Sequence, residues 1–129
     1  MRIVVLIARI LLGLLFLVAG AMKFYFAATT GGPPPPPLAG LAGQFTDIMF
    51  KSHYIVLVCA FEVIAGVLLL VNRYVRLALV ITAALVINIL TYHITMYPAG
   101  IVPGLIALVL WLVVAWPQRA TFAAFFSAT

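Results

Sequence analysis

Four long apolar runs determine what this chain of 129 residues can fold into. They cover residues 3–26, 53–71, 75–92 and 100–116. An α-helix rises ~1.5 Å per residue, so a run of about 20 residues crosses a hydrocarbon core of about 30 Å. Each run therefore predicts one transmembrane helix.

The composition places the whole chain in a membrane. Hydrophobic residues make up 67% of it and charged residues only 7%, with a mean hydropathy of +1.34, whereas soluble domains are about half apolar. We expect an all-α, integral membrane four-helix bundle, with residues 1–129 forming a single transmembrane domain. A chain this small buries little surface alone, so we also expect other membrane subunits or a homo-oligomer as partners, besides the lipid bilayer.

The longest connection, residues 27–52, forms an outer loop with two parts. Prolines occupy positions 33–37, and apolar residues then recur at helical spacing at Leu38, Leu41, Phe45 and Ile48. Such spacing is typical of an amphipathic helix that lies in the membrane interface. The sequence thus predicts a proline-rich loop followed by a short interfacial helix.

Basic residues near the ends of the runs predict the orientation. Four arginines lie on one side of the membrane, at the two termini and near the short connection between the second and third runs. They are Arg2, Arg73, Arg76 and Arg119. Only Lys23 and Lys51 lie opposite, so both termini should face the cytoplasm, in a bacterial inner membrane. The net charge of +5 then reflects topology. No basic patch falls on a soluble face, which argues against nucleic-acid binding.

Each run also presents one face of small or polar residues, the composition that favours close helix packing in membranes. The first run carries Arg9, Gly13, Phe16, Gly20 and Lys23; the second Cys59, Glu62 and Gly66, with Arg73 just after it; the third Ala84, Asn88, Thr91 and Thr95; the fourth Gly100, Gly104, Ala107, Trp111 and Ala115. We expect these four faces to point into the bundle.

Glu62 is one of only two acidic residues, and it lies within the second run. A carboxylate at membrane depth is costly and marks either a structural ion pair or a functional site. By helical rise Glu62 lies ~14 Å from the outer end and Asn88 ~18 Å from the inner end. With the long side chain of Arg9, these residues are predicted to form an intramembrane polar cluster. Its role is open between structural pairing and a proton-accepting or quinone-facing site.

The outer rim offers a second set of candidates, Lys23, His53 and His93. Two histidines at one level can ligate a b-type haem, or one can donate a hydrogen bond to a quinone carbonyl. We rank the quinone contact above haem ligation. The sequence has no clustered set of metal ligands and no nucleophile beside a base, so we predict no metal site and no hydrolytic chemistry.

Short motifs along the chain resemble those of the DoxX family of small four-helix membrane proteins. They are residues 8–13 (ARILLG), 20–24 (GAMKF), 61–66 (FEVIAG) with the leucine run 68–70, and the basic turn 73–76 (RYVR). The resemblance implies a membrane subunit associated with redox systems, such as that of a thiosulfate:quinone oxidoreductase. It makes Arg9, Lys23 and Glu62 the matching polar positions.

Together these observations favour a subunit of a larger, quinone-linked redox assembly that contributes a polar intramembrane site rather than acting alone. The alternative is a non-catalytic structural or assembly subunit of a membrane complex. In either case the bilayer is the first partner.

Overall fold

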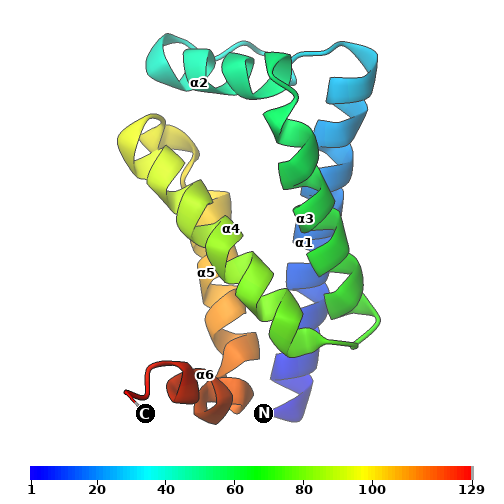
Figure 1. Ribbon diagram of the computed structural model, residues 1–129, viewed down its shortest axis with the longest axis vertical. Coiled ribbons are helices and arrows are strands. Elements are labelled where there is room, and N and C mark those ends of the chain that lie inside the picture. The colour runs from blue at the N-terminus through cyan, green and yellow to red at the C-terminus, as the bar shows by residue number, and fades with distance from the viewer. Residues whose placement is uncertain (129) are drawn as a thin grey trace.

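The computed structural model describes residues 1–128, and within them every regular element is a helix (Figure 1). The order is α1 (Arg2–Thr29), α2 (Gly40–Lys51), α3 (Tyr54–Leu70), α4 (Val75–Thr95), η1 (Pro98–Gly100), α5 (Val102–Ala115), η2 (Trp116–Gln118) and α6 (Arg119–Phe125). Both termini lie at one end of the bundle, which we call the inner end, and α2 lies across the other, the outer end (Figure 1).

The helices are long and apolar enough to span a membrane. Three qualify alone: α1, α4 and the stretch Val102–Phe125. A fourth span follows when α2 and α3, which meet at 86°, are counted as one bent pair. The protein is thus an integral membrane protein, and the predicted all-α bundle is confirmed.

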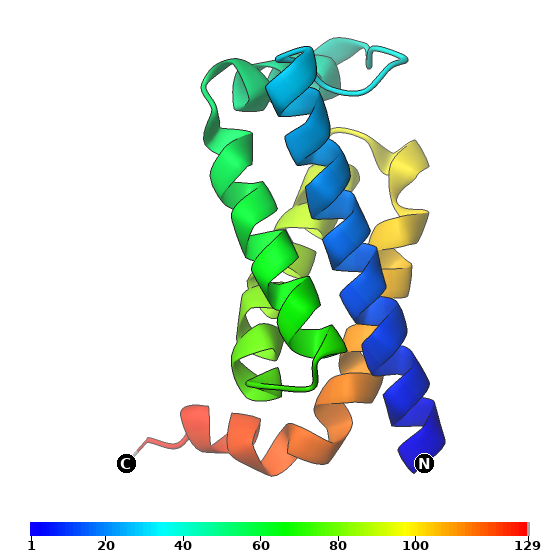
Figure 2. The same ribbon diagram turned by 90° about the vertical axis from the view of Figure 1, so that its right-hand side faces the viewer.

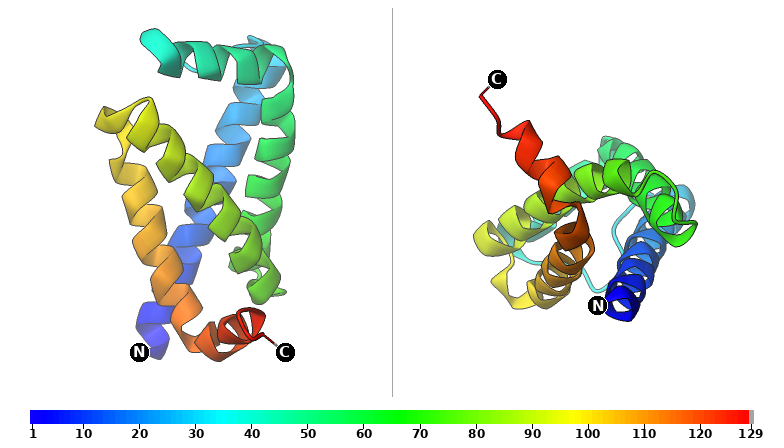
Figure 3. Two further views of the ribbon diagram at one scale, coloured as in Figure 1. Left: turned by 60° about the vertical axis from the view of Figure 1, so that its left-hand side comes forward. Right: turned by 90° about the horizontal axis from the view of Figure 1, so that it is seen from below.

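The helix limits differ from the predicted spans by more than one residue at three places. The first helix continues to Thr29, α4 continues to Thr95, and α5 begins only at Val102. After α5, η2 with Pro117 and α6 lead the chain across the inner end (Figure 3). The predicted interfacial helix is confirmed as α2, where Lys51 pairs with Asp47 at 2.7 Å.

Glycines bring α1 and α3 into backbone contact along their length (Figure 2). A Cβ atom added at Gly66 would lie 2.7 Å from the backbone N of Leu17 and 2.8 Å from the O of Gly13. One added at Gly20 would lie 2.9 Å from the Cβ of Glu62. Small residues permit such close approach of transmembrane helices, where van der Waals packing drives association. These three glycines therefore fix how α1 and α3 meet.

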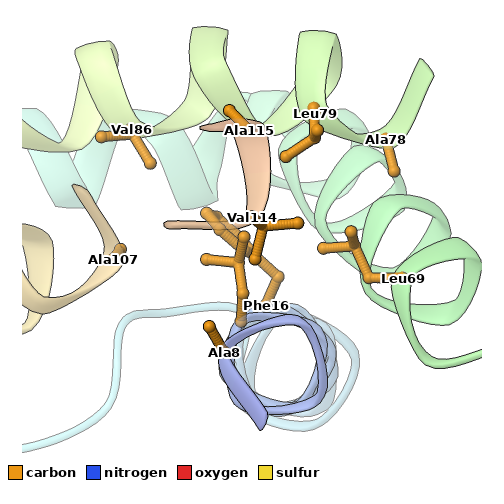
Figure 4. Packing of buried hydrophobic residues seen from close by; sticks show 10 residues of the cluster. Ala8, Phe16, Leu69, Ala78, Leu79, Val86, Ala107, Val114 and Ala115 are labelled. Carbon is orange, nitrogen blue, oxygen red and sulfur yellow. The ribbon is translucent and has the colours of Figure 1, made fainter. Parts of the chain in front are cut away.

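The helices pack tightly in the inner half of the bundle. A buried cluster joins α1, α3, α4 and α5, and its members include Leu12, Phe16, Leu69, Leu79 and Val114 (Figure 4). The indole N–H of Trp111 donates to the Leu79 carbonyl at 2.8 Å, which links α5 to α4. The inner end is thereby closed by side chains.

The predicted inward faces are confirmed for α1, α3 and α5, where their glycines and alanines are buried. Arg73 and Gly100, also expected on these faces, lie outside α3 and α5, and Arg73 is exposed. The face predicted for α4 is confirmed only in part, because Ala84 and Asn88 line a cavity between the helices whereas Thr91 and Thr95 do not. Helix α4 buries Ala78, Leu79, Thr82 and Val86, and its polar side chains at Asn88, Thr91 and Thr95 are exposed. Each of those three donates to the carbonyl four residues earlier, at 2.7–2.8 Å. Because this local bond satisfies a donor, these side chains do not need a partner on another helix.

The glycine contact gives a first prediction. Gly66→Ala should lower the free energy of unfolding by about 1–3 kcal/mol, because the new methyl group meets backbone atoms that cannot rotate away. Denaturant unfolding in detergent micelles measures the change. Gly32→Ala is the control, since nothing lies within 4 Å of a Cβ there. Equal stability of the two variants would contradict the packing argument.

The orientation can be tested with introduced cysteines, because the native Cys59 is only 1% exposed. We expect a membrane-impermeant maleimide to label Gly32→Cys, in the outer loop, on intact cells. The same reagent should label Ala124→Cys, on the exposed side of α6, only after the membrane is permeabilised. The reverse pattern would place both termini outside the cell.

Candidate functional site

A cavity of about 840 Å³ occupies the outer half of the bundle. All four spanning helices line it, and Phe45, Met49 and Phe50 of α2 cover it from the outer end. Phe16 and Ala107 belong both to its wall and to the buried inner cluster. The cavity therefore ends where the tight inner packing begins.

Lys23 and Glu62 form an ion pair on the α1–α3 side of this cavity. Lys23 Nζ donates to Glu62 Oε1 at 2.6 Å. The Glu62 side chain is 1% exposed and that of Lys23 is 32% exposed, so the lysine is the member of the pair that reaches open space. The pair forms because Gly20, one turn before Lys23, lets the backbone of α1 rest against Glu62. A charge at this depth requires such a partner.

The other carboxylate oxygen of Glu62 has no partner. Oε2 is buried, and among residues 1–128 no group donates a hydrogen bond to it. Buried polar atoms in folded proteins are nearly always hydrogen-bonded, so each exception needs an explanation.

Neither of the partners expected for Glu62 from the sequence bonds to it. The guanidinium of Arg9 instead donates to the carbonyl oxygens of Leu69 and Leu70 at the end of α3. A cation is favourable there, because the last carbonyls of a helix are unpaired and carry partial negative charge. Asn88 lines the same cavity as Glu62, but its amide donates to Ala84 O at 2.8 Å. The polar cluster thus separates into an inner arginine cap and an outer cavity site.

Helix α4 supplies the polar groups of the opposite wall, Asn88, Tyr92 and His93. Phe45 of α2 stacks on the Tyr92 ring with centroids 5.5 Å apart, which holds α2 against α4. His93 Nδ1 lies 3.1 Å from the carbonyl oxygen of Tyr97. A carbonyl only accepts, so this contact places a proton on Nδ1 and leaves Nε2 of the neutral ring as an acceptor.

The two histidines do not meet in the cavity. His53 is exposed in the turn between α2 and α3, where it adopts a left-handed φ of 61°, and it is not part of the cavity wall. Within the described chain, no group of three or more His, Cys, Asp or Glu side chains is placed to hold a metal ion.

Sequence reasoning missed three features of the site: the cavity, Tyr92 as a wall residue, and the pairing of Lys23 with Glu62. A signal for the pair was present. Lys23 lies six residues before the end of α1 at Thr29, and Glu62 lies eight after the start of α3 at Tyr54. At ~1.5 Å per residue both are about 9–12 Å below the outer end, on faces that carry glycine.

The ion pair yields a stability prediction. Lys23→Met should lower the free energy of unfolding by about 2–3 kcal/mol, because it leaves the Glu62 charge buried without a partner. Breaking an ion pair in which both members are fully buried would lower it further, but Lys23 is 32% exposed. The double variant Lys23→Met/Glu62→Met should recover most of this loss. Lys51→Met is the matched control, since its exposed pair with Asp47 is worth less than about 1 kcal/mol. Denaturant unfolding in micelles provides the comparison, and equal losses for the two single variants would refute the buried-charge argument.

Comparison with known proteins identifies the chain at the family level. No curated protein and no solved structure matches it. The DoxX family model matches residues 4–94, a range that contains α2, α3 and nearly all of α1 and α4. This integral membrane protein therefore belongs to the DoxX family.

Proposed function

We propose that the protein is a membrane subunit of a quinone-linked redox assembly, and that its outer cavity binds the quinone ring. On this proposal it lies in a bacterial inner membrane with both termini in the cytoplasm, and the electron-transfer partners are other subunits. The observation that carries the proposal is the cavity: a mostly apolar chamber that presents an ion pair on one wall and histidine and amide groups on the other.

The size and lining of the cavity suit such a ligand. Small-molecule sites typically measure about 300–1,000 Å³ and combine apolar walls with a few placed polar groups. A cavity of about 840 Å³ accepts a substituted six-membered ring together with the first part of an apolar tail. Lys23 on α1 and Asn88 on α4 lie on different walls, and the Asn88 amide has a second N–H besides the one donated to Ala84. A quinone likewise carries its two carbonyl oxygens, which accept hydrogen bonds, on opposite edges of the ring.

The cavity also reaches the surface that faces lipid. Five of its wall residues on α3 and α4 are exposed, namely Tyr54, Phe61, Val80, Ala84 and Asn88, with Phe61 at 50% and Val80 at 49%. In a membrane these exposed positions contact acyl chains. A ligand dissolved in the bilayer can therefore enter between α3 and α4, while the inner cluster blocks passage through the bundle. This arrangement supports a lipid-soluble ligand over a transported ion.

Membership of the DoxX family supports the redox setting, because the motifs shared with it imply a subunit of redox systems. The competing proposal is a structural or assembly subunit, whose cavity would hold no quinone. Since both proposals predict co-purifying membrane proteins, only the contents of the cavity separate them.

The decisive measurement is the quinone content of protein purified from native membranes in mild detergent. We expect organic extraction and mass spectrometry to find close to one quinone per chain. Ala84→Trp should reduce this content at least about tenfold, because the indole occupies the opening between α3 and α4. Ile87→Trp is the control, being exposed on α4 but outside the cavity wall. Wild-type protein that carries no quinone and cannot be loaded with it would favour the structural alternative.

A further inference from the structure

The unpartnered oxygen of Glu62 identifies what kind of group the cavity is built to bind. Oε2 is buried and receives no hydrogen bond within residues 1–128, although Oε1 is bound by Lys23. An ionised carboxylate only accepts hydrogen bonds. The missing partner must therefore be a donor, an N–H or O–H group.

Lys23 supplies the complementary capacity beside this oxygen. Its ammonium group has three N–H donors, and its one described hydrogen bond goes to Glu62 Oε1. Among the described residues no other Asp, Glu, Lys or Arg side chain lines the cavity; Arg9 is held at the Leu69 carbonyl, and Asp47 is paired with Lys51 on α2. The ion pair thus has unused donors on the partly exposed Lys23 and one unused, buried acceptor on Glu62.

A hydroxyl group matches this combination, since its oxygen accepts while its proton is donated. We propose that Lys23 and Glu62 bind a ligand hydroxyl, which accepts from Nζ and donates to Oε2, so that the cavity prefers the hydroquinone to the quinone. A quinone carbonyl can accept from Nζ but has no proton for Oε2. This inference rests on the proposed function, because it assigns the redox form of the same ligand.

The pair has one fixed and one movable member. Glu62 is 1% exposed, and its Cβ lies where α1 makes its close approach at Gly20, which leaves the carboxylate little room to move. Lys23 is 32% exposed and has a flexible four-carbon chain. Binding therefore moves the lysine toward the ligand and opens the way to Oε2.

The experiment compares three ligands that share one alkyl tail: a hydroquinone, the corresponding quinone, and the dimethyl ether of the hydroquinone. Purified protein in lipid nanodiscs is titrated by calorimetry without oxygen, with empty nanodiscs as the reference. The wild-type protein should bind the hydroquinone at least about tenfold more tightly than the other two ligands, because a site that bonds a hydroxyl discriminates against analogues lacking it. Glu62→Gln should bring the ratios of the dissociation constants of the three ligands close to one. Asp47→Asn neutralises the second acidic residue of the chain, which lies outside the cavity wall, and should leave these ratios unchanged.

The outcomes separate this inference from the function on which it rests. Equal binding of hydroquinone and quinone by the wild-type protein, or tighter binding of the quinone, overturns the inference and leaves the proposed function standing. No binding of any of the three overturns the proposed function itself. If Glu62→Gln does not fold, the wild-type protein still tests the inference: equal affinities for the hydroquinone and its dimethyl ether would overturn it.

Discussion

Backbone contact between α1 and α3 is the constraint on which the rest of the structure depends. Gly13 and Gly66 face each other where a single methyl group would collide with main-chain atoms, and Gly20 abuts Glu62. With helices this close, Lys23 reaches a carboxylate that would otherwise lie unpaired in an apolar medium. The small residues thus allow the ion pair that stabilises the Glu62 charge within the membrane. Bulky side chains at these positions would keep the two helices too far apart for the pair to form.

The two ends of the bundle are packed differently. At the inner end, large side chains such as Phe16, Leu69 and Leu79 fill the space between four helices. At the outer end, α4 diverges from α3 (Figure 1) and α2 crosses above the space between them. The bundle is therefore packed on one side of the membrane and hollow on the other, so that the cavity has access to lipid without a path across the bilayer.

Much of the fold follows from the sequence, whereas the contacts within the site do not. Length and hydropathy locate the spans to within a few residues, since both are properties of one helix at a time. The expected contact between Arg9 and Glu62 does not form, for a local reason. The Arg9 guanidinium donates to carbonyl oxygens at the end of α3, nearer the inner end than Glu62. Asn88 shares the cavity with Glu62, but its amide bonds within its own helix, so depth and polarity alone did not show whether the two side chains make contact.

By itself, the sequence determined the membrane setting, the apolar spans, the interfacial helix α2 and the glycine-bearing faces of α1 and α3. These depend on periodicity and composition, which are local along the chain. Only the tertiary structure decided that Lys23 is the partner of Glu62, and that Tyr92 and His93 share a cavity with them. Those relations depend on how far each helix is rotated and tilted against its neighbours, and rotation and tilt are set by side-chain packing between helices.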